Sequence, residues 1–237
     1  MTGLTEGRLK HARVGPKTNV MRSLREPISF AQGVYLLLAF AGIGLVLDLA
    51  GGPPIGLRQW VVLILLLGFV VQPLSTLIHE LGHAAAVIGL ARRRALVVVG
   101  RSPWAELKAG RLHVRFGPRP ARGVLFRGLC VHDSEGLPWR TLGLIALAGP
   151  LATFLELALL LAAAPALWHA GALLRPLIVL TAGCLTGSLL SNLSGEPLRG
   201  SGGRIVVGQR DGWQARRAFA LHRQGAPPPR RGGAAAS

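Results

Sequence analysis

Four long apolar runs constrain the fold of this chain of 237 residues more than any other feature. Each run has 20 or more residues, and they cover positions 28–50, 60–91, 141–164 and 173–193. A helix of about 20 predominantly apolar residues is long enough to cross the hydrocarbon core of a bilayer. The first run is too long for the core of a signal peptide and lacks a convincing cleavage site, so we expect it to be retained. The sequence therefore predicts an α-helical polytopic membrane protein with about four transmembrane helices.

The basic residues set the expected orientation in the membrane. The chain has 27 Lys and Arg residues and a formal net charge of +17. All but Arg58 and Arg175 fall in three segments, 1–27, 91–140 and 195–237. Because loops rich in Lys and Arg stay on the cytoplasmic side, we expect a multi-pass protein of a bacterial plasma membrane with both termini in the cytoplasm. This topology and the attraction of basic loops to anionic lipid explain the charge, so the lipid bilayer is an expected partner and a specific nucleic acid is not.

Polarity divides the chain into three parts. Residues 1–27 form a basic N-terminal segment, residues 28–215 a membrane-embedded domain, and residues 216–237 a basic C-terminal tail that we expect to be disordered. Within the membrane domain, the segment 95–132 has short runs of β character separated by Gly and Pro, at 97–99, 111–116 and 123–126. This pattern predicts a small cytoplasmic β-rich insertion between the second and third transmembrane helices.

The second apolar run contains the residues His79-Glu80-Leu81-Gly82-His83. On a helix, residues four apart lie on one face, so His79 and His83 can present two imidazole nitrogens to one cation. Neutral imidazoles suit Zn²⁺, and the carboxylate of Glu80 can then act as general base on a metal-bound water. Ionisable groups are costly within a membrane span, which argues against a chance cluster here. The motif predicts a catalytic zinc site with Zn²⁺ as cofactor.

Other polar residues are weaker candidates. Glu156 lies in the third apolar run, where a carboxylate is either functional or a protonated partner of a neighbouring helix. For three further positions we favour a structural or solvated role over metal ligation: Asp48, His113 and the pair His132-Asp133. Cys130 and Cys184 lie far apart and form no CxxC pattern, so neither a disulfide framework nor a cysteine zinc site is expected.

With these motifs the chain resembles the site-2 protease family of intramembrane zinc metalloproteases over roughly residues 60–215. The run His79 to Ala84 matches the metal motif of that family, and Ala148-Gly149-Pro150 looks like its small-Gly-Pro element. Asn192 followed by Asp211-Gly212 looks like its C-terminal motif. The resemblance implies that His79 and His83 bind zinc, that Glu80 is the catalytic carboxylate, and that Asp211 is the third ligand.

The chain departs from the family pattern at three places. Thr153 stands where the family usually has Asn, and Asn192 is followed by Leu-Ser-Gly195 instead of reaching Pro at the third position. The interval before Asp211 is long, and the nearer Ser201-Gly202-Gly203 carries no aspartate. We favour Asp211 as third ligand because it is the only acidic residue after Glu196 and precedes a glycine, and Glu156 is the reserve ligand.

The resulting functional hypothesis is hydrolysis of peptide bonds in or near transmembrane segments of membrane-protein substrates. Asn192 is expected to bind the substrate backbone, a role that follows from the resemblance. An edge strand within residues 95–132 could hold a locally unwound substrate by strand addition. The alternative is a non-proteolytic metal-binding membrane protein that binds clients or takes part in metal transport, and the altered motif around Asn192 motivates it.

Overall fold

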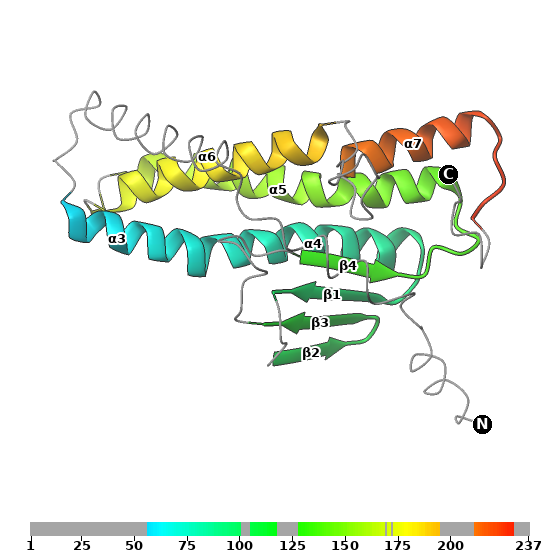
Figure 1. Cartoon of the computed structure of the whole chain (residues 1–237), viewed down its shortest axis with the longest axis horizontal. Helices are drawn as coiled ribbons and strands as arrows, with labels where there is room; N and C mark the ends of the chain where they lie inside the picture. Colours follow the sequence, from blue (N-terminus) through cyan, green and yellow to red (C-terminus); the bar gives the residue numbers. More distant parts are fainter. Residues whose placement is uncertain are drawn as a thin grey trace, which may run out of the picture.

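The computed structural model describes residues 56–100, 105–117, 128–168, 170–171, 173–194 and 211–229, a mainly helical structure with one small β-sheet (Figure 1). Within these residues three helices are long and apolar enough to cross a membrane: Arg58–Leu90, Trp139–Leu167 and Leu174–Leu193. They coincide with the second, third and fourth predicted runs. The first predicted run, 28–50 with Asp48, and the segment 1–27 lie outside the described residues.

The longest helix is built from three consecutive elements, α3 (Leu57–Leu66), the π-helical turn η2 (Leu67–Val71) and α4 (Gln72–Leu90). Pro73 accounts for the wider turn, because proline has no N–H and its ring crowds the carbonyl group one turn earlier. In η2 the N–H of Gln72 donates to the carbonyl oxygen of Leu67, five residues back. The helix therefore continues past Pro73 without a break and includes the histidine motif.

The predicted β-rich insertion is a four-stranded sheet with the order β2-β3-β1-β4. Its strands are β1 (Ala95–Val99), β2 (Ala105–Ala109), β3 (Leu112–Phe116) and β4 (Gly128–His132). Strand β1 pairs with β3 in parallel and with β4 antiparallel, while β2 and β3 form an antiparallel hairpin. Gly110 makes the hairpin turn with a φ of 58°, a conformation that favours glycine. The predicted run 123–126 lies outside the described residues, and strands β2 and β4 were not predicted.

One face of this sheet packs against α4. The buried side chains of Ala95, Val97 and Val99 alternate along β1, as expected for a strand with one covered face. They share a core with Ala84 and Val87 of α4. This packing places β4, one end of the sheet order, alongside the helix that carries the histidines (Figure 1).

Two further long helices complete the apolar part, α5 (Trp139–Leu167) and α6 (Leu174–Leu193). Helices α4 and α5 cross at Gly82, where an added Cβ would lie 2.5 Å from the carbonyl oxygen of Ala148 and 2.7 Å from Cβ of Ala152. Small residues at a crossing allow two helix backbones to approach closely, as in membrane helix pairs. The close crossing brings the histidine face of α4 against the Ala148-Gly149-Pro150 element of α5.

The outer surfaces of the long helices are strongly apolar. Three large side chains on different helices are more than 60% exposed: Phe69 at 62%, Leu159 at 72% and Leu190 at 67%. Such surfaces are unfavourable in water and suit contact with lipid. Together with the lengths of the helices, this confirms the expectation of a mainly helical protein with helices long and apolar enough to cross a membrane.

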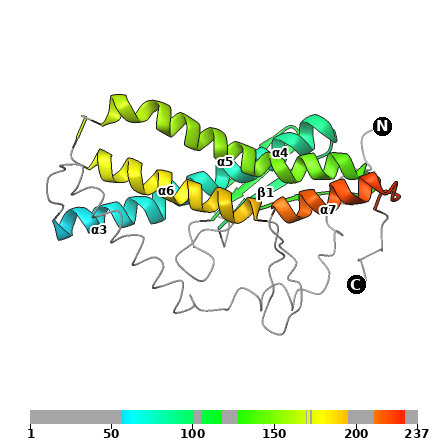
Figure 2. The same ribbon diagram turned by 90° about the horizontal axis from the view of Figure 1, so that it is seen from above.

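Helix α7 (Asp211–Arg223) follows α6 and packs along the first half of α5 (Figures 1 and 2). The boundary that we placed between residues 215 and 216 lies within this helix. The chain beyond α7 returns to the start of α5, where Pro229 accepts a hydrogen bond from the N–H of Gly136 and Pro227 one from the indole of Trp139. These contacts fix the far end of α7 relative to α5.

Candidate metal centre

His79 and His83 lie one turn apart on the face of α4 that is turned toward α5. Their ring centroids are 4.9 Å apart and the ring planes are nearly perpendicular, with an interplanar angle of 82°. His83 is buried and His79 is largely buried. The spacing of four residues therefore has the predicted result, two imidazoles directed to one point.

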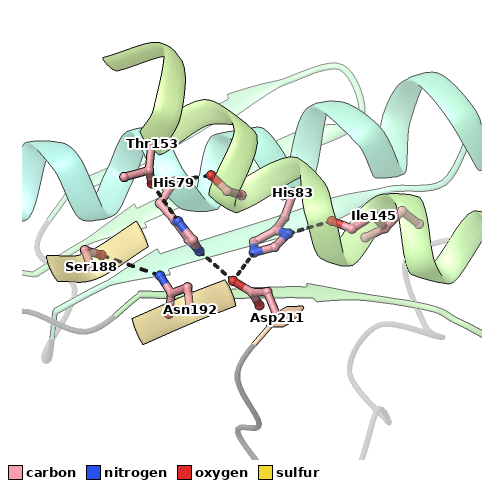
Figure 3. Close-up of polar contacts among 8 residues, drawn as sticks. His79, His83, Ile145, Thr153, Ser188, Asn192 and Asp211 are labelled. Atoms are coloured by element: carbon pink, nitrogen blue, oxygen red, sulfur yellow. Dashed lines mark hydrogen bonds and ion pairs between the residues drawn. The ribbon is translucent and has the colours of Figure 1, made fainter. Parts of the chain in front are cut away.

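Asp211, the first residue of α7, meets the two histidines (Figure 3). Its Oδ2 atom is 3.0 Å from Nε2 of His79 and 3.5 Å from Nε2 of His83. Among the described residues these three form a group that could hold a metal ion, with one ligand atom from each residue and all ligand atoms within 4.8 Å of one another. Two nitrogens and one carboxylate oxygen from distant parts of the chain thus converge.

The other ring nitrogen of each histidine has a partner on α5. Nδ1 of His83 donates to the carbonyl oxygen of Ile145 at 2.7 Å, and Nδ1 of His79 lies 2.9 Å from the hydroxyl oxygen of Thr153. The Thr153 hydroxyl in turn lies 3.4 Å from the carbonyl oxygen of Gly149 and can donate to it. With the proton on Nδ1, the Nε2 lone pair of each ring is free for a metal. Partners of this kind orient metal-binding histidines and fix their tautomer.

Gly149 allows α5 to approach the imidazoles. A Cβ at this position would overlap the His83 ring and lie 2.7 Å from Nε2 of His79. No side chain fits between the helix backbone and the two rings, which gives the predicted small-Gly-Pro element a concrete packing role. Pro150 follows inside α5 and the helix continues through it.

The position of Asp211 depends on close contacts of α7 with two helices. A Cβ on Gly212 would overlap the backbone of Leu193 at the end of α6. Further along, the ring of Phe219 covers Gly143 of α5, where an added Cβ would lie 2.9 Å from the ring. Glycine on both surfaces lets α7 start against α6 and run along α5, and this path places Asp211 between the histidines.

The environment of Asp211 favours its charged form. Burial alone would raise the pKa of its carboxyl group, but hydrogen bonds with His79 and His83 outweigh burial and hold this pKa below its ordinary value. Asp211 is therefore ionised at neutral pH. When both imidazoles are neutral with their protons on Nδ1, the two Nε2 lone pairs and this anionic oxygen form a suitable donor set for a divalent cation.

Glu80 is buried between α4 and strand β4. Its side chain fills the space beside Gly128, where an added Cβ would overlap it, and its carboxylate accepts a hydrogen bond from the backbone N–H of Cys130. The same carboxylate is close enough to interact electrostatically with both histidines and with Asp211. Glu80 thus lies next to the metal group without belonging to it.

The structure separates the remaining candidates. The reserve ligand Glu156 accepts a hydrogen bond from Ser75 at 2.6 Å and is not part of the three-residue group. Asn192 is half-buried near the end of α6, and its side-chain amide lies 3.5 Å from the Ser188 hydroxyl (Figure 3). Asn192 therefore lies beside the site while Glu156 lies further along α5.

Three residues for which we predicted a structural or solvated role do not belong to the three-residue group. His113 lies 3.4 Å from Glu106 on the sheet, and Asp133 pairs with Arg93 at 3.1 Å. His132 points inward from β4, and burial together with the nearby His83 lowers its pKa. Burial raises the pKa of Cys130 to about 12, so its thiol stays protonated and is a poor metal ligand.

Sequence reasoning missed the roles of Thr153 and Ile145. Thr153 was noted only as a departure from the family pattern, although a hydroxyl three residues after the Gly-Pro step was a usable signal. The contribution of Ile145 is a backbone carbonyl, which the side-chain pattern cannot reveal. Comparison of the chain with protein-family models, curated proteins and solved structures finds no significant match.

Proposed function

We propose that this protein is an intramembrane zinc metalloprotease that hydrolyses peptide bonds in or near transmembrane segments of other membrane proteins. The observation that carries the proposal is the convergence of His79, His83 and Asp211 beside the buried Glu80, on helices long and apolar enough to span a membrane. This combination of residues fits the expectation from the sequence resemblance.

The donor set fits zinc in chemistry and spacing. Ligand atoms about 2.0–2.2 Å from a tetrahedral Zn²⁺ ion are roughly 3.3–3.5 Å from one another. The two separations, 3.0 Å from Oδ2 of Asp211 to Nε2 of His79 and 3.5 Å to Nε2 of His83, lie close to this value. Three protein ligands leave a fourth position, as catalytic zinc sites require. When bound there, zinc would supply Lewis-acid chemistry, making water a stronger acid and polarising a carbonyl group.

The chain's own residues would supply the remaining functions. Glu80 is adjacent in sequence to His79 and electrostatically close to the metal group, so its carboxylate can accept a proton from the attacking water. The same group can later pass this proton to the leaving amine. Asn192, half-buried beside the site near the end of α6, can donate its amide hydrogens to a substrate carbonyl.

Strand β4 offers a way to hold an extended substrate. In the described sheet it stands at the end of the strand order, so its outer edge is not paired within the sheet. The backbone of Gly128 and Cys130 in this strand contacts the side chain of Glu80. A peptide paired with the outer edge of β4 would therefore lie close to the carboxylate of Glu80. Strand addition also satisfies the backbone groups that a substrate helix exposes when it unwinds.

Replacing Glu80 with Gln tests the proposal. We expect Glu80→Gln to retain zinc and to lose cleavage of single-span reporter proteins in proteoliposomes, because the ligands remain and the proton acceptor is gone. Glu106→Gln, at an exposed carboxylate on strand β2, is the control and should leave both properties unchanged. Zinc binding without Glu80-dependent cleavage would favour the alternative, a non-proteolytic membrane protein that uses the metal for client binding or transport.

A further inference from the structure

Helix α7 begins where a membrane-spanning helix ends. Helix α6 finishes at Leu193, and the backbone of this residue contacts Gly212 near the start of α7. Figures 1 and 2 both show α7 continuing the direction of α6. Unlike α6, helix α7 carries several basic side chains, which do not remain in a hydrocarbon core. The boundary of the hydrocarbon core therefore falls near the junction of the two helices.

Two faces of α7 differ sharply. Gly212, Ala215 and Ala218 are buried at intervals of three residues and face α5. On the opposite side of the helix lie Trp213, Arg216 and Arg217, at spacings of three and four. We call these three residues the α7 arginine face.

The α7 arginine face has uncompensated charge. Arg216 and Arg217 are both exposed, and within the described residues no carboxylate forms an ion pair with either of them. The guanidinium group of Arg217 instead lies over the ring of Trp213, 5.2 Å from its centre. The one acidic residue of α7, Asp211, is engaged by the two histidines.

Distance along the helix places this face at headgroup level. With a rise of about 1.5 Å per residue, Arg216 lies about 7–8 Å beyond Asp211. The polar layer of one leaflet is roughly 5–8 Å thick. Tryptophan is enriched at this level, and guanidinium groups bind phosphate through paired hydrogen bonds.

We propose that the α7 arginine face binds the phosphate headgroup of an anionic phospholipid in the adjacent leaflet. The guanidinium groups of Arg216 and Arg217 hold the phosphate, and Trp213 lies beside the glycerol region of the lipid. A protein partner with an acidic segment fits the location less well, since a membrane span directly before α7 brings lipid headgroups to this face without any other molecule. Because Asp211 is the first residue of the same helix, bound lipid would also steady the end of α7 that supplies the third ligand.

Lipid retention by the full chain tests this proposal independently of any protease activity. The protein would be equilibrated in mixed micelles of phosphatidylcholine and phosphatidylglycerol, and bound lipid would be measured by native mass spectrometry. We expect preferential binding of phosphatidylglycerol, weakened on the order of 20-fold by Arg216→Gln/Arg217→Gln, since each basic residue near an anionic surface contributes about five-fold. Arg216→Lys/Arg217→Lys keeps the charge and should retain most of the preference.

A charge-matched control comes from the sheet. Lys108→Gln/Arg111→Gln removes two exposed positive charges at the β2–β3 turn and should change phosphatidylglycerol binding less than two-fold. Equal loss in this control would show a general charge effect and overturn the proposal, as would unchanged binding in the Arg216/Arg217 variant. Displacement of the lipid by free inorganic phosphate or by a soluble polyglutamate peptide at equal concentration would also overturn it, in favour of a soluble anion or an acidic protein segment.

Discussion

The hydroxyl oxygen of Thr153 on α5 lies 2.9 Å from Nδ1 of His79 on α4. Thr153 is almost fully buried, with 2% of its surface exposed, so this contact is shielded from water. Its hydroxyl oxygen can accept a hydrogen bond from Nδ1–H of His79, and its own hydrogen can be donated to the carbonyl oxygen of Gly149. The contact therefore favours the tautomer with the proton on Nδ1, which leaves the lone pair of Nε2 of His79 directed toward Asp211.

Replacing Thr153 with Val should weaken metal binding. Valine has nearly the same shape but no acceptor, so Nδ1 of His79 loses its partner and the tautomer is no longer fixed. Loss of such an outer partner typically lowers metal affinity about 10–100-fold. Competition with a zinc chelator would measure the change. Thr153→Ser keeps the hydroxyl and should restore affinity, so equal affinities in the Val and wild-type proteins would contradict the role of this contact.

Substitution of Asp211 and substitution of Glu156 should affect zinc binding differently, because we propose only Asp211 as the third ligand. Asp211→Ala removes the oxygen that lies 3.0 Å from His79, and we expect zinc affinity to fall by more than about 100-fold, beyond the effect of an outer partner. Glu156→Ala should retain stoichiometric zinc, because Glu156 is hydrogen-bonded to Ser75 and lies apart from the metal group. Zinc content of the purified proteins, measured by mass spectrometry of the metal, decides between them. Retention in the Asp211 variant with loss in the Glu156 variant would reverse the assignment.

Cys130 should be an inert thiol. Burial raises its pKa to about 12, so at pH 8 only about one molecule in ten thousand carries the reactive thiolate, against about one in ten at the ordinary pKa of 9.0. We expect iodoacetamide to modify Cys130 slowly in the folded protein and rapidly after denaturation in dodecyl sulfate, with peptide mapping as the measurement. The folded rate should rise as the pH approaches 12. Cys130→Ser should retain zinc, and loss of the metal in that variant would show that the thiol is a ligand.

The sequence predicted the elements whose signal is local. Length and hydropathy located the three long helices, and the spacing of four residues placed His79 and His83 on one face. Strand β2 was missed because Ala-Glu-Leu-Lys-Ala has little β propensity, and its pairing with β3 is reinforced by the 2.8 Å contact between Glu106 and Arg115. A strand that is stabilised mainly by pairing with its neighbour has only a weak β pattern in its own sequence.

The remainder of the site depends on contacts between helices. Asp211 was chosen from a resemblance and its glycine neighbour, whereas its position in space depends on how α7 packs against α5 and α6. Glu156 was the reserve ligand, but it lies one turn beyond Thr153 on α5 and accepts a hydrogen bond from Ser75. The Ile145 carbonyl contributes through the close approach at Gly149, which no side-chain pattern encodes.

Gly128 should control the position of Glu80. A methyl group at this residue of β4 would overlap the Glu80 side chain, so Gly128→Ala must push the carboxylate away or shift the strand. The proposed metal ligands lie outside β4, so we expect zinc binding to change less than about three-fold. Cleavage should fall at least about 100-fold, the lower end of the contribution of a general base. Zinc titration and reporter cleavage, measured on the same preparation, separate the two effects.

Gly110→Ala is unsuitable as a control for Gly128→Ala, because its positive φ would introduce strain of its own. Gly183 on α6 is better suited, since an added Cβ there has no neighbour within 4 Å. Gly183→Ala should leave both zinc binding and cleavage unchanged. If Gly128→Ala cleaved reporters at the wild-type rate, the carboxylate would not need its position against β4, and the assignment of Glu80 as general base would lose its structural support. If it lost zinc together with activity, the strand would instead be required to support the metal ligands, and the separation between ligand group and general base would be wrong.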